Sequence, residues 1–407
     1  MEILLLNLFV FLRPVLLIEF ELTLAGLNTF EIAAIVLMGM LVATFVYSAS
    51  LNKELSLTSL DLWMAVFVLW GVVVFVTYFD RAILSEAAKL LLPIATLTLV
   101  KNMIASREQY RRLLFLMILG FTIPLAVSFV LIMQGKGVEF VNYWTGLPRY
   151  AGAFGNAHQL GHSMALLLMC MVIYAAMANQ DSMKGANRLV TRTMLLLFGP
   201  IAALALVCLY YSYARTPMLG LAIFGTSYLY FLSKRVFLAW LIAATIAVLT
   251  VIPLDVLFYD FQEVSEHELA ERGGSASGRA EMWEHSITEF GKLPLDRMIG
   301  GVGIGNLDRA AARTGEQFID SHNEFLNVLT QTGIVGLGIF LVIQILILKR
   351  ILDLQGHERY VFLALFLAVT FMNFVSNSYV SRFGIAQLFY VIIAYIDNPR
   401  LGSRQSA

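Results

Sequence analysis

Long apolar segments separated by short polar connections run through most of the chain. An apolar helix needs roughly 17–25 residues to cross the hydrocarbon core of a bilayer, and twelve segments approach or reach this length. We expect transmembrane helices at 3–19, 30–49, 61–79, 83–100, 112–134, 160–178, 193–211, 216–233, 236–258, 327–348, 360–378 and 381–396. The first contains Arg13 and Pro14, and the fourth contains Lys89. The pattern predicts an all-α polytopic membrane protein with about twelve transmembrane helices.

The distribution of basic residues predicts the orientation of these helices. Lys and Arg are enriched in the cytoplasmic connections of membrane proteins. If the N-terminus is cytoplasmic, the inner connections contain fifteen basic residues and the short outer connections contain five. Every inner connection then has at least one basic residue, and moving a single helix would destroy the alternation. We therefore expect a multi-pass protein of the bacterial inner membrane.

One connection on the outer side is much longer than the others. We expect residues 1–258 to form the first nine helices, 259–326 a large periplasmic loop, 327–396 the last three helices, and 397–407 a cytoplasmic tail, with a smaller outer loop at 135–159. Within the large loop, Trp283, Ile287 and Phe290 are spaced by four and three residues. This spacing predicts a short helix over Arg279–Phe290, which we expect the glycine-rich run 300–305 to end.

Composition agrees with a membrane protein and narrows its chemistry. Hydrophobic residues make up 59% of the chain and charged residues 14%, with a formal net charge of zero. Soluble domains contain about 25% charged residues, and the absence of net charge gives no attraction to nucleic acid. Cys170 and Cys208 both lie in apolar segments, so the sequence predicts neither a disulfide framework nor a zinc site.

Four polar patches fall on the expected outer side. They are Arg149–His158, Tyr210–Pro217, Ser277–Trp283 and Asp320–Glu324. Each has a structural interpretation: an interfacial arginine such as Arg215 reaches lipid headgroups, and one of Asp320, Ser321 and Asn323 would cap the next helix. Lys89, three residues after Glu86, is an arrangement typical of a buried ion pair.

The expected compartment gives these patches a chemical interpretation. No nucleotide-sugar supply exists outside the cytoplasmic membrane, so an activated glycosyl donor must arrive attached to a lipid. Arginines form bidentate, charge-assisted hydrogen bonds to the phosphates of such a donor, and histidine is the most common general base near neutral pH. The outer loops contain no acidic cluster suited to a metal ion, so we expect arginines to stabilise the leaving group and no metal or other cofactor to take part.

The motifs in these patches resemble those of the O-antigen ligase and polymerase superfamily. His322-Asn323 is followed by nine residues, Glu324–Thr332, and then by Gly333-Ile334-Val335-Gly336, which is similar to the ligase signature. Upstream, the run from Arg279 through Trp283 to Gly301-Val302-Gly303 resembles the large-loop pattern of the family. Ser212-Tyr213-Ala214-Arg215 and Gly152–Asn156 resemble two further outer motifs.

The resemblance implies a fold, an activity and a set of site residues. The implied fold is a membrane glycosyltransferase of GT-C-like architecture. The implied activity is transfer of polysaccharide from undecaprenyl diphosphate to the lipid A core, with inversion. His322 would be the base, and Arg215 and Arg279 would bind the diphosphate. The remaining candidates for substrate binding are Arg149, Lys89, Trp283 and Asn323, and the alternative role for Asn323 is to orient the histidine.

Other functions compatible with the sequence differ in what they predict. A polymerase of the same superfamily would extend a lipid-linked repeat, and the nine-residue spacing favours the ligase over it. A protein-glycosylating relative usually has a larger soluble region. A transporter of lipid-linked glycans would show repeat symmetry and polar sites near the midplane, whereas here polar residues gather at one face. A scaffold would not need a histidine and two arginines there.

Overall fold

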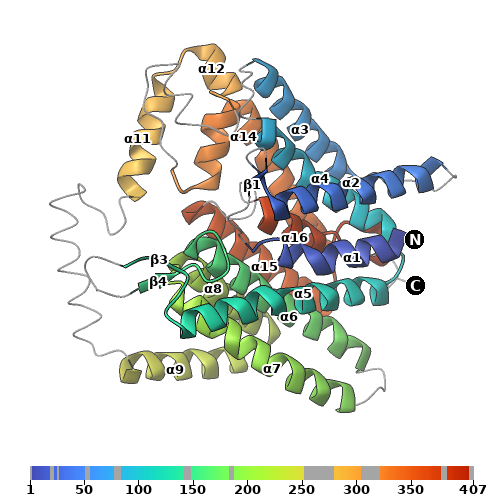
Figure 1. Ribbon diagram of the computed structural model, residues 1–407, viewed down its shortest axis with the longest axis vertical. Helices are drawn as coiled ribbons and strands as arrows, with labels where there is room; N and C mark the ends of the chain where they lie inside the picture. The colour runs from blue at the N-terminus through green and yellow to red at the C-terminus, as the bar shows by residue number, and fades with distance from the viewer. Residues whose placement is uncertain are drawn as a thin grey trace.

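The computed structural model shows a bundle of helices with a smaller helical loop region at one end (Figure 1). It describes residues 2–18, 23–24, 27–50, 56–77, 84–141, 148–182, 188–251, 279–303, 321–376 and 383–402. Each of the twelve apolar segments contains a helix. These are α1 (Glu2–Val15), α2 (Thr29–Ser50), α3 (Ser59–Thr77), α4 (Leu84–Met103), α5 (Arg107–Met133), α6 (Ala157–Ser182), α7 (Arg188–Tyr211), α8 (Arg215–Leu232), α9 (Lys234–Val251), α14 (Glu324–Asp353), α15 (Gly356–Val375) and α16 (Phe383–Ile393).

The longest of these helices satisfy the requirements for crossing a membrane. Among the described residues, α3, α5, α14, α15 and the first 22 residues of α6 are long and apolar enough by length and composition. Shorter apolar stretches lie within α2 and α7. The chain is therefore a multi-pass membrane protein with an all-α core.

Helix α6 is the centre of the bundle and packs against α5, α7, α8 and α15. In its apolar part, 89% of the residues are buried, and Met164, Leu167 and Cys170 are fully inaccessible. At the periphery, helices such as α3 expose large apolar side chains, including Leu69 and Val73. A helix that is apolar on all sides belongs in a protein core or in lipid, so the exposed apolar faces are the lipid-facing surface.

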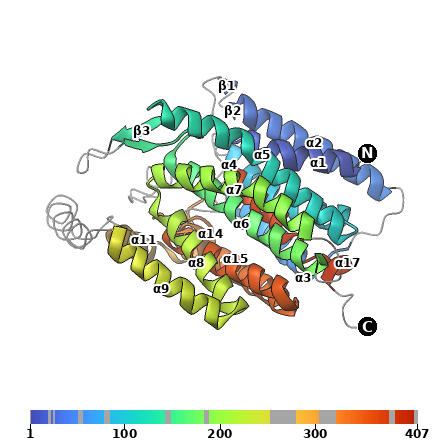
Figure 2. The same ribbon diagram turned by 90° about the horizontal axis from the view of Figure 1, so that it is seen from below.

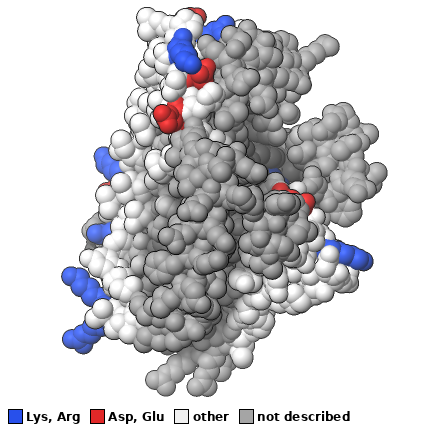
Figure 3. Space-filling view, turned by 90° about the vertical axis from the view of Figure 1, so that its left-hand side faces the viewer, with Lys and Arg blue, Asp and Glu red and all other residues white. Residues whose placement is uncertain are grey.

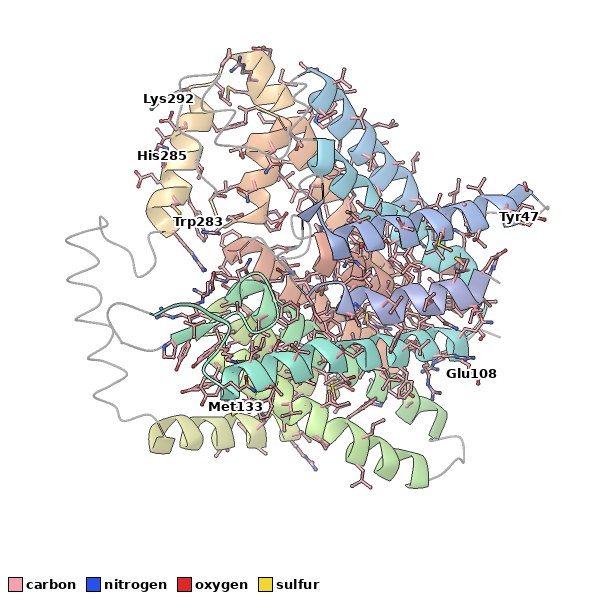
Figure 4. The ribbon with its side chains drawn as sticks, viewed as in Figure 1. Tyr47, Glu108, Met133, Trp283, His285 and Lys292 are labelled. Atoms are coloured by element: carbon pink, nitrogen blue, oxygen red, sulfur yellow. The ribbon has the colours of Figure 1, made fainter. Side chains whose placement is uncertain are left out.

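Alternate connections lie at opposite ends of the bundle, as the distribution of basic residues predicts. In Figure 4, Tyr47 near the end of α2 and Glu108 at the start of α5 lie at the same end as the N-terminus, whereas Met133 at the end of α5 and Trp283 lie at the other end. We call the end that contains Met133 and Trp283 the site end. All four polar patches of the sequence belong to connections at this end.

A buried ion-pair network at the opposite end joins the C-terminal segment to the bundle. Lys101 of α4 is buried and forms ion pairs with Asp61 of α3 and with Asp397, the latter at 2.9 Å. Arg350 of α14 lies 3.2 Å from the other carboxylate oxygen of Asp397. Because an unpaired buried charge is strongly destabilising, each of these residues requires the others. The sequence indicated cytoplasmic basic residues here but not this pairing.

Several short elements were not predicted. Two hairpins are formed by β1 (Thr23–Leu24) with β2 (Leu27–Asn28) and by β3 (Val138–Val141) with β4 (Pro148–Tyr150), and α17 covers Pro399–Gly402. The helix expected from Arg279 is confirmed as α11 (Arg279–Gly291), but the glycine run does not end it. A second helix, α12 (Leu295–Gly300), follows Pro294 and is capped at its C-terminus by Gly301, because proline favours a helix start and glycine a helix end.

Candidate active site

The turn between α7 and α8 places Arg215 at the site end. The Ser212 hydroxyl donates to the Leu209 carbonyl at 2.7 Å and accepts from the Ala214 amide at 3.2 Å. Tyr213 is in the left-handed region with φ 46°. Ser212 and Ala214 are buried against α6 at Gly161, where a Cβ atom would lie 2.7 Å from that of Ala214. The turn is therefore rigid, and Arg215 begins α8 with its side chain exposed.

Arg149 lies on strand β4, whose partner strand supplies a carboxylate. The Nε atom of Arg149 is 3.7 Å from Oε2 of Glu139, and the same oxygen accepts from the Ala157 amide at the start of α6. Burial lowers the pKa of Arg149; the Glu139 carboxylate opposes this shift, and the positive charge of Arg215 adds to it. The hairpin thus brings Arg149 within electrostatic range of Arg215.

Arg279 reaches the same place from the large loop. It is the first residue of α11, and its Nη1 atom donates to the hydroxyl of Thr216, the neighbour of Arg215, at 3.4 Å. Burial lowers the pKa of Arg279, and the charge of Arg215 lowers it further. Three arginines from three separate connections therefore share one electrostatic environment, with Glu139 as a nearby carboxylate. Binding of an anion with more than one negative charge would relieve their mutual repulsion.

His322 lies in a strained turn directly before α14. Its φ is 47°, and its side chain is half-buried. The next residue, Asn323, caps α14: its Oδ1 atom accepts from the amides of Phe325 at 3.0 Å and Leu326 at 3.2 Å. The expectation that a residue of this patch caps the helix is confirmed for Asn323. A non-glycine residue with positive φ is uncommon and frequently marks a functional site.

The nine-residue spacing after Asn323 is the length of one helical segment. Helix α14 is interrupted at Gly333, which has φ 70° and ψ −173°. The break prevents the carbonyls of Thr330, Gln331 and Thr332 from accepting the usual bonds from residues four positions later. The cap at Asn323 and the break at Gly333 thus delimit the segment that presents His322.

Each of these three freed carbonyls has another donor. The Val302 amide donates to Thr330 at 2.9 Å and the Gly303 amide to Gln331 at 3.2 Å. The indole of Trp70 on α3 donates to Thr332 at 2.8 Å. Such replacement is required inside a membrane, where water does not satisfy free carbonyls.

Two glycines allow the backbone of the large loop to lie this close to the backbone of α14. A Cβ at Gly301 would lie 2.2 Å from the Gln331 oxygen, and one at Gly333 would lie 2.1 Å from the Ile299 oxygen. Gly301 and Gly333, one from each sequence motif, therefore serve one purpose, which is to let the backbone of the large loop pack directly onto α14.

Trp283 of α11 contacts the turn that contains His322. Its Nε1 atom donates to the Ser321 carbonyl at 2.8 Å, and its ring packs edge-on against Phe374 of α15 with centroids 5.2 Å apart. Figure 4 shows Trp283 and His285 on different sides of α11. The structure thus gives Trp283 a bond to the turn that contains His322, and its contact with substrate stays a prediction.

The structure brings most candidate residues together. Arg149, Arg215 and Arg279 converge, and Trp283 links α11 to the turn of His322. Lys89 lies in the first half of α4, and its side chain is outside the described part of the structure. Glu139 and Thr216 were missed by the sequence analysis. Thr216 directly follows a candidate arginine, which is a usable signal, whereas Glu139 has no distinguishing pattern.

We call Arg149, Arg215 and Arg279 the arginine cluster. The surface over α11 and α12 differs from it because charges of both signs lie there. Figure 3 views the molecule from the site end, and near the top, over these two helices, basic and acidic side chains are mixed. Glu289 and Lys292 pair there at 2.5 Å. Within the described ranges, no group of three His, Cys, Asp or Glu side chains is placed to hold a metal ion.

The fold and the site define a multi-pass membrane protein with a cationic cluster and a histidine at one end of its helices. Residues 200–341 match the model of the O-antigen ligase family. This segment, about a third of the chain, includes Arg215, Arg279 and His322, while Arg149 precedes it. The match supports membership of the chain in the O-antigen ligase family and confirms the resemblance found in its motifs. No match was found among curated proteins.

Proposed function

We propose that the protein is an O-antigen ligase that transfers polysaccharide from undecaprenyl diphosphate to the lipid A core at the periplasmic face of the inner membrane. The observation that carries this proposal is the convergence of Arg149, Arg215 and Arg279 at the same end as His322. The arginine cluster supplies the charge that a diphosphate requires, and the histidine supplies a base.

An apolar cavity next to the cluster suits the lipid part of this donor. The cavity has a volume of about 1060 Å³ and lies between α6, α7, α8 and α9. Figure 2 shows α7, α8 and α9 side by side at this surface. Tyr210 and Met218 line its site end, on either side of the turn that presents Arg215. A lipid diphosphate would thus place its chain among apolar side chains and its phosphates on the arginines.

The proposed reaction is an inverting displacement at the anomeric carbon of the donor sugar. The acceptor hydroxyl oxygen forms a bond to this carbon while the bond to the diphosphate oxygen breaks. His322 takes the hydroxyl proton, and undecaprenyl diphosphate leaves with the bonding electrons, its charge stabilised by Arg215 and Arg279. Asn323 contributes by fixing the start of α14, and so the turn that precedes it.

The break in α14 bears on the alternative of a transporter. Discontinuous helices in transporters use their free backbone groups to bind substrates and ions. Here the carbonyls of Thr330, Gln331 and Thr332 accept from Val302, Gly303 and Trp70. These groups are occupied by the protein itself, which favours a structural role for the break and a transferase function for the site end.

Purified protein in liposomes should transfer glycan from an undecaprenyl-diphosphate donor to lipid A core oligosaccharide, and EDTA should not reduce the rate. The reason is that arginines, in place of Mg²⁺, carry the leaving-group charge. The measurement is product formation with and without EDTA, using a donor-only reaction to detect polymerase activity. Extension of the donor without transfer to lipid A would identify a polymerase, and rescue of an EDTA-treated sample by Mg²⁺ would reveal a metal site.

Cysteine labelling should place the site end in the periplasm. The native cysteines Cys170 and Cys208 are buried, whereas Ile287 of α11 and Asp353 at the end of α14 are exposed. We expect an impermeant maleimide added to intact spheroplasts to label Ile287→Cys, and to label Asp353→Cys only after lysis. The reverse pattern would place the arginine cluster in the cytoplasm and exclude the proposed donor chemistry.

A further inference from the structure

We infer that Trp283 is a positioning residue that couples occupation of the arginine cluster to the geometry of the His322 turn. It would act through α11, and the inference rests on the proposed function of the two sites that it connects. The role is distinct from substrate contact, since the polar atom of Trp283 is bonded to the Ser321 carbonyl.

Helix α11 makes one contact with each part of the site. Arg279 and Trp283 are four residues apart and so lie on the same face of the helix, one turn from each other. At one position Arg279 donates to Thr216 of α8, and at the other Trp283 donates to Ser321, directly before His322. A single helical turn therefore bridges the start of α8 and the start of α14.

The bond at the His322 turn controls the orientation of a peptide plane. The Ser321 carbonyl belongs to the peptide that ends at the His322 nitrogen, so the direction of this carbonyl and the φ of His322 are linked. That φ is 47°, a conformation that the surroundings must hold in place. Trp283 is itself braced by Phe374 of α15, and Ser321 by a hydroxyl bond of 2.9 Å to Asn327. Loss of the indole bond would loosen the histidine without unfolding α14.

The bond at the arginine end is weaker and replaceable. Arg279 donates a single hydrogen bond of 3.4 Å to a neutral hydroxyl, whereas a guanidinium group and a phosphate form shorter and frequently bidentate hydrogen bonds. A diphosphate oxygen would therefore compete successfully with Thr216 for Arg279. A shift of α11 that accompanied this exchange would reach Ser321 through Trp283, and donor binding would in this way adjust the position of the base.

Trp283→Phe tests this coupling, because phenylalanine keeps an aromatic ring against Phe374 and removes only the indole N–H. We expect the single-turnover transfer rate to fall about 10- to 100-fold, the range produced by a small misplacement of a catalytic group. Affinity for undecaprenyl diphosphate should fall far less than the rate, because the arginines that bind it are unchanged, and the fall should equal the small coupling free energy that the indole bond transmits. Trp70→Phe is the matched control, since it also removes an indole bond to a carbonyl of α14, at Thr332, but does not touch α11. Trp70→Phe should lower thermal stability about as much as Trp283→Phe does. It should not lower the transfer rate by more than it lowers donor affinity.

Hydrogen exchange provides a readout that does not depend on turnover. Undecaprenyl diphosphate should slow exchange in the peptide covering residues 321–326 of the wild type and of Trp70→Phe, but not of Trp283→Phe. Equal slowing in all three proteins, or wild-type transfer by Trp283→Phe, would overturn the coupling and leave the proposed function intact. If the wild type did not bind undecaprenyl diphosphate, the proposed function would fail, and the coupling with it.

Discussion

Replacement of His322 by asparagine should reduce single-turnover transfer by about 10²- to 10⁴-fold while donor binding stays intact. This range is typical for removal of a general base. Asparagine is the most informative substitution, because His322 has a φ of 47° and asparagine tolerates this conformation better than alanine does. The variant therefore keeps the turn and removes the base.

The same variant separates catalysis from a structural role. If His322 only shaped the turn before α14, His322→Asn would keep most of the wild-type activity. His322→Ala would then lower stability and activity together. His285→Ala is a suitable control, since it alters a histidine on α11 whose side chain lies on a different side from Trp283 (Figure 4). Near wild-type transfer by His322→Asn would end the assignment of His322 as the base.

Replacement of Arg279 or Arg215 by alanine should weaken binding of undecaprenyl diphosphate by about 10- to 100-fold. Hydrogen bonds to charged groups contribute about 1.5–3 kcal/mol, and about 1.4 kcal/mol corresponds to a factor of ten. Lysine should restore only part of the affinity, because it lacks the bidentate geometry of the guanidinium group. The measurement is donor affinity together with the single-turnover rate for each variant.

The loss of donor affinity should depend on whether the arginine belongs to the cluster, and not only on the loss of a positive charge. Arg297→Ala on α12 removes an arginine of the same loop outside the cluster and should leave affinity unchanged. An Arg215 that merely reaches lipid headgroups would accept lysine without loss. Full activity of Arg215→Lys and Arg279→Lys would therefore contradict bidentate recognition of the diphosphate.

The helices and the local motifs of this protein are determined by its sequence. Apolar segments of membrane-spanning length predicted twelve helices, and all twelve segments contain one. The spacing of Trp283, Ile287 and Phe290 predicted α11. These features depend on neighbours within one or two helical turns, and the requirement to satisfy the backbone in lipid makes a helix nearly obligatory for such segments. The positions of Arg215, Arg279 and His322 in outer connections followed from the same alternation.

Only the tertiary structure decided how these connections meet. The sequence gives no indication that Arg279 would contact Thr216, that Trp283 would bind the Ser321 carbonyl, or that Lys101 would be buried between Asp61 and Asp397. Each contact joins residues from separate elements or connections of the chain, and so depends on which helices pack together. The nine-residue spacing was visible in the sequence, but its cause was not. The cause is a helix broken at Gly333 so that its free carbonyls accept from the loop and from Trp70.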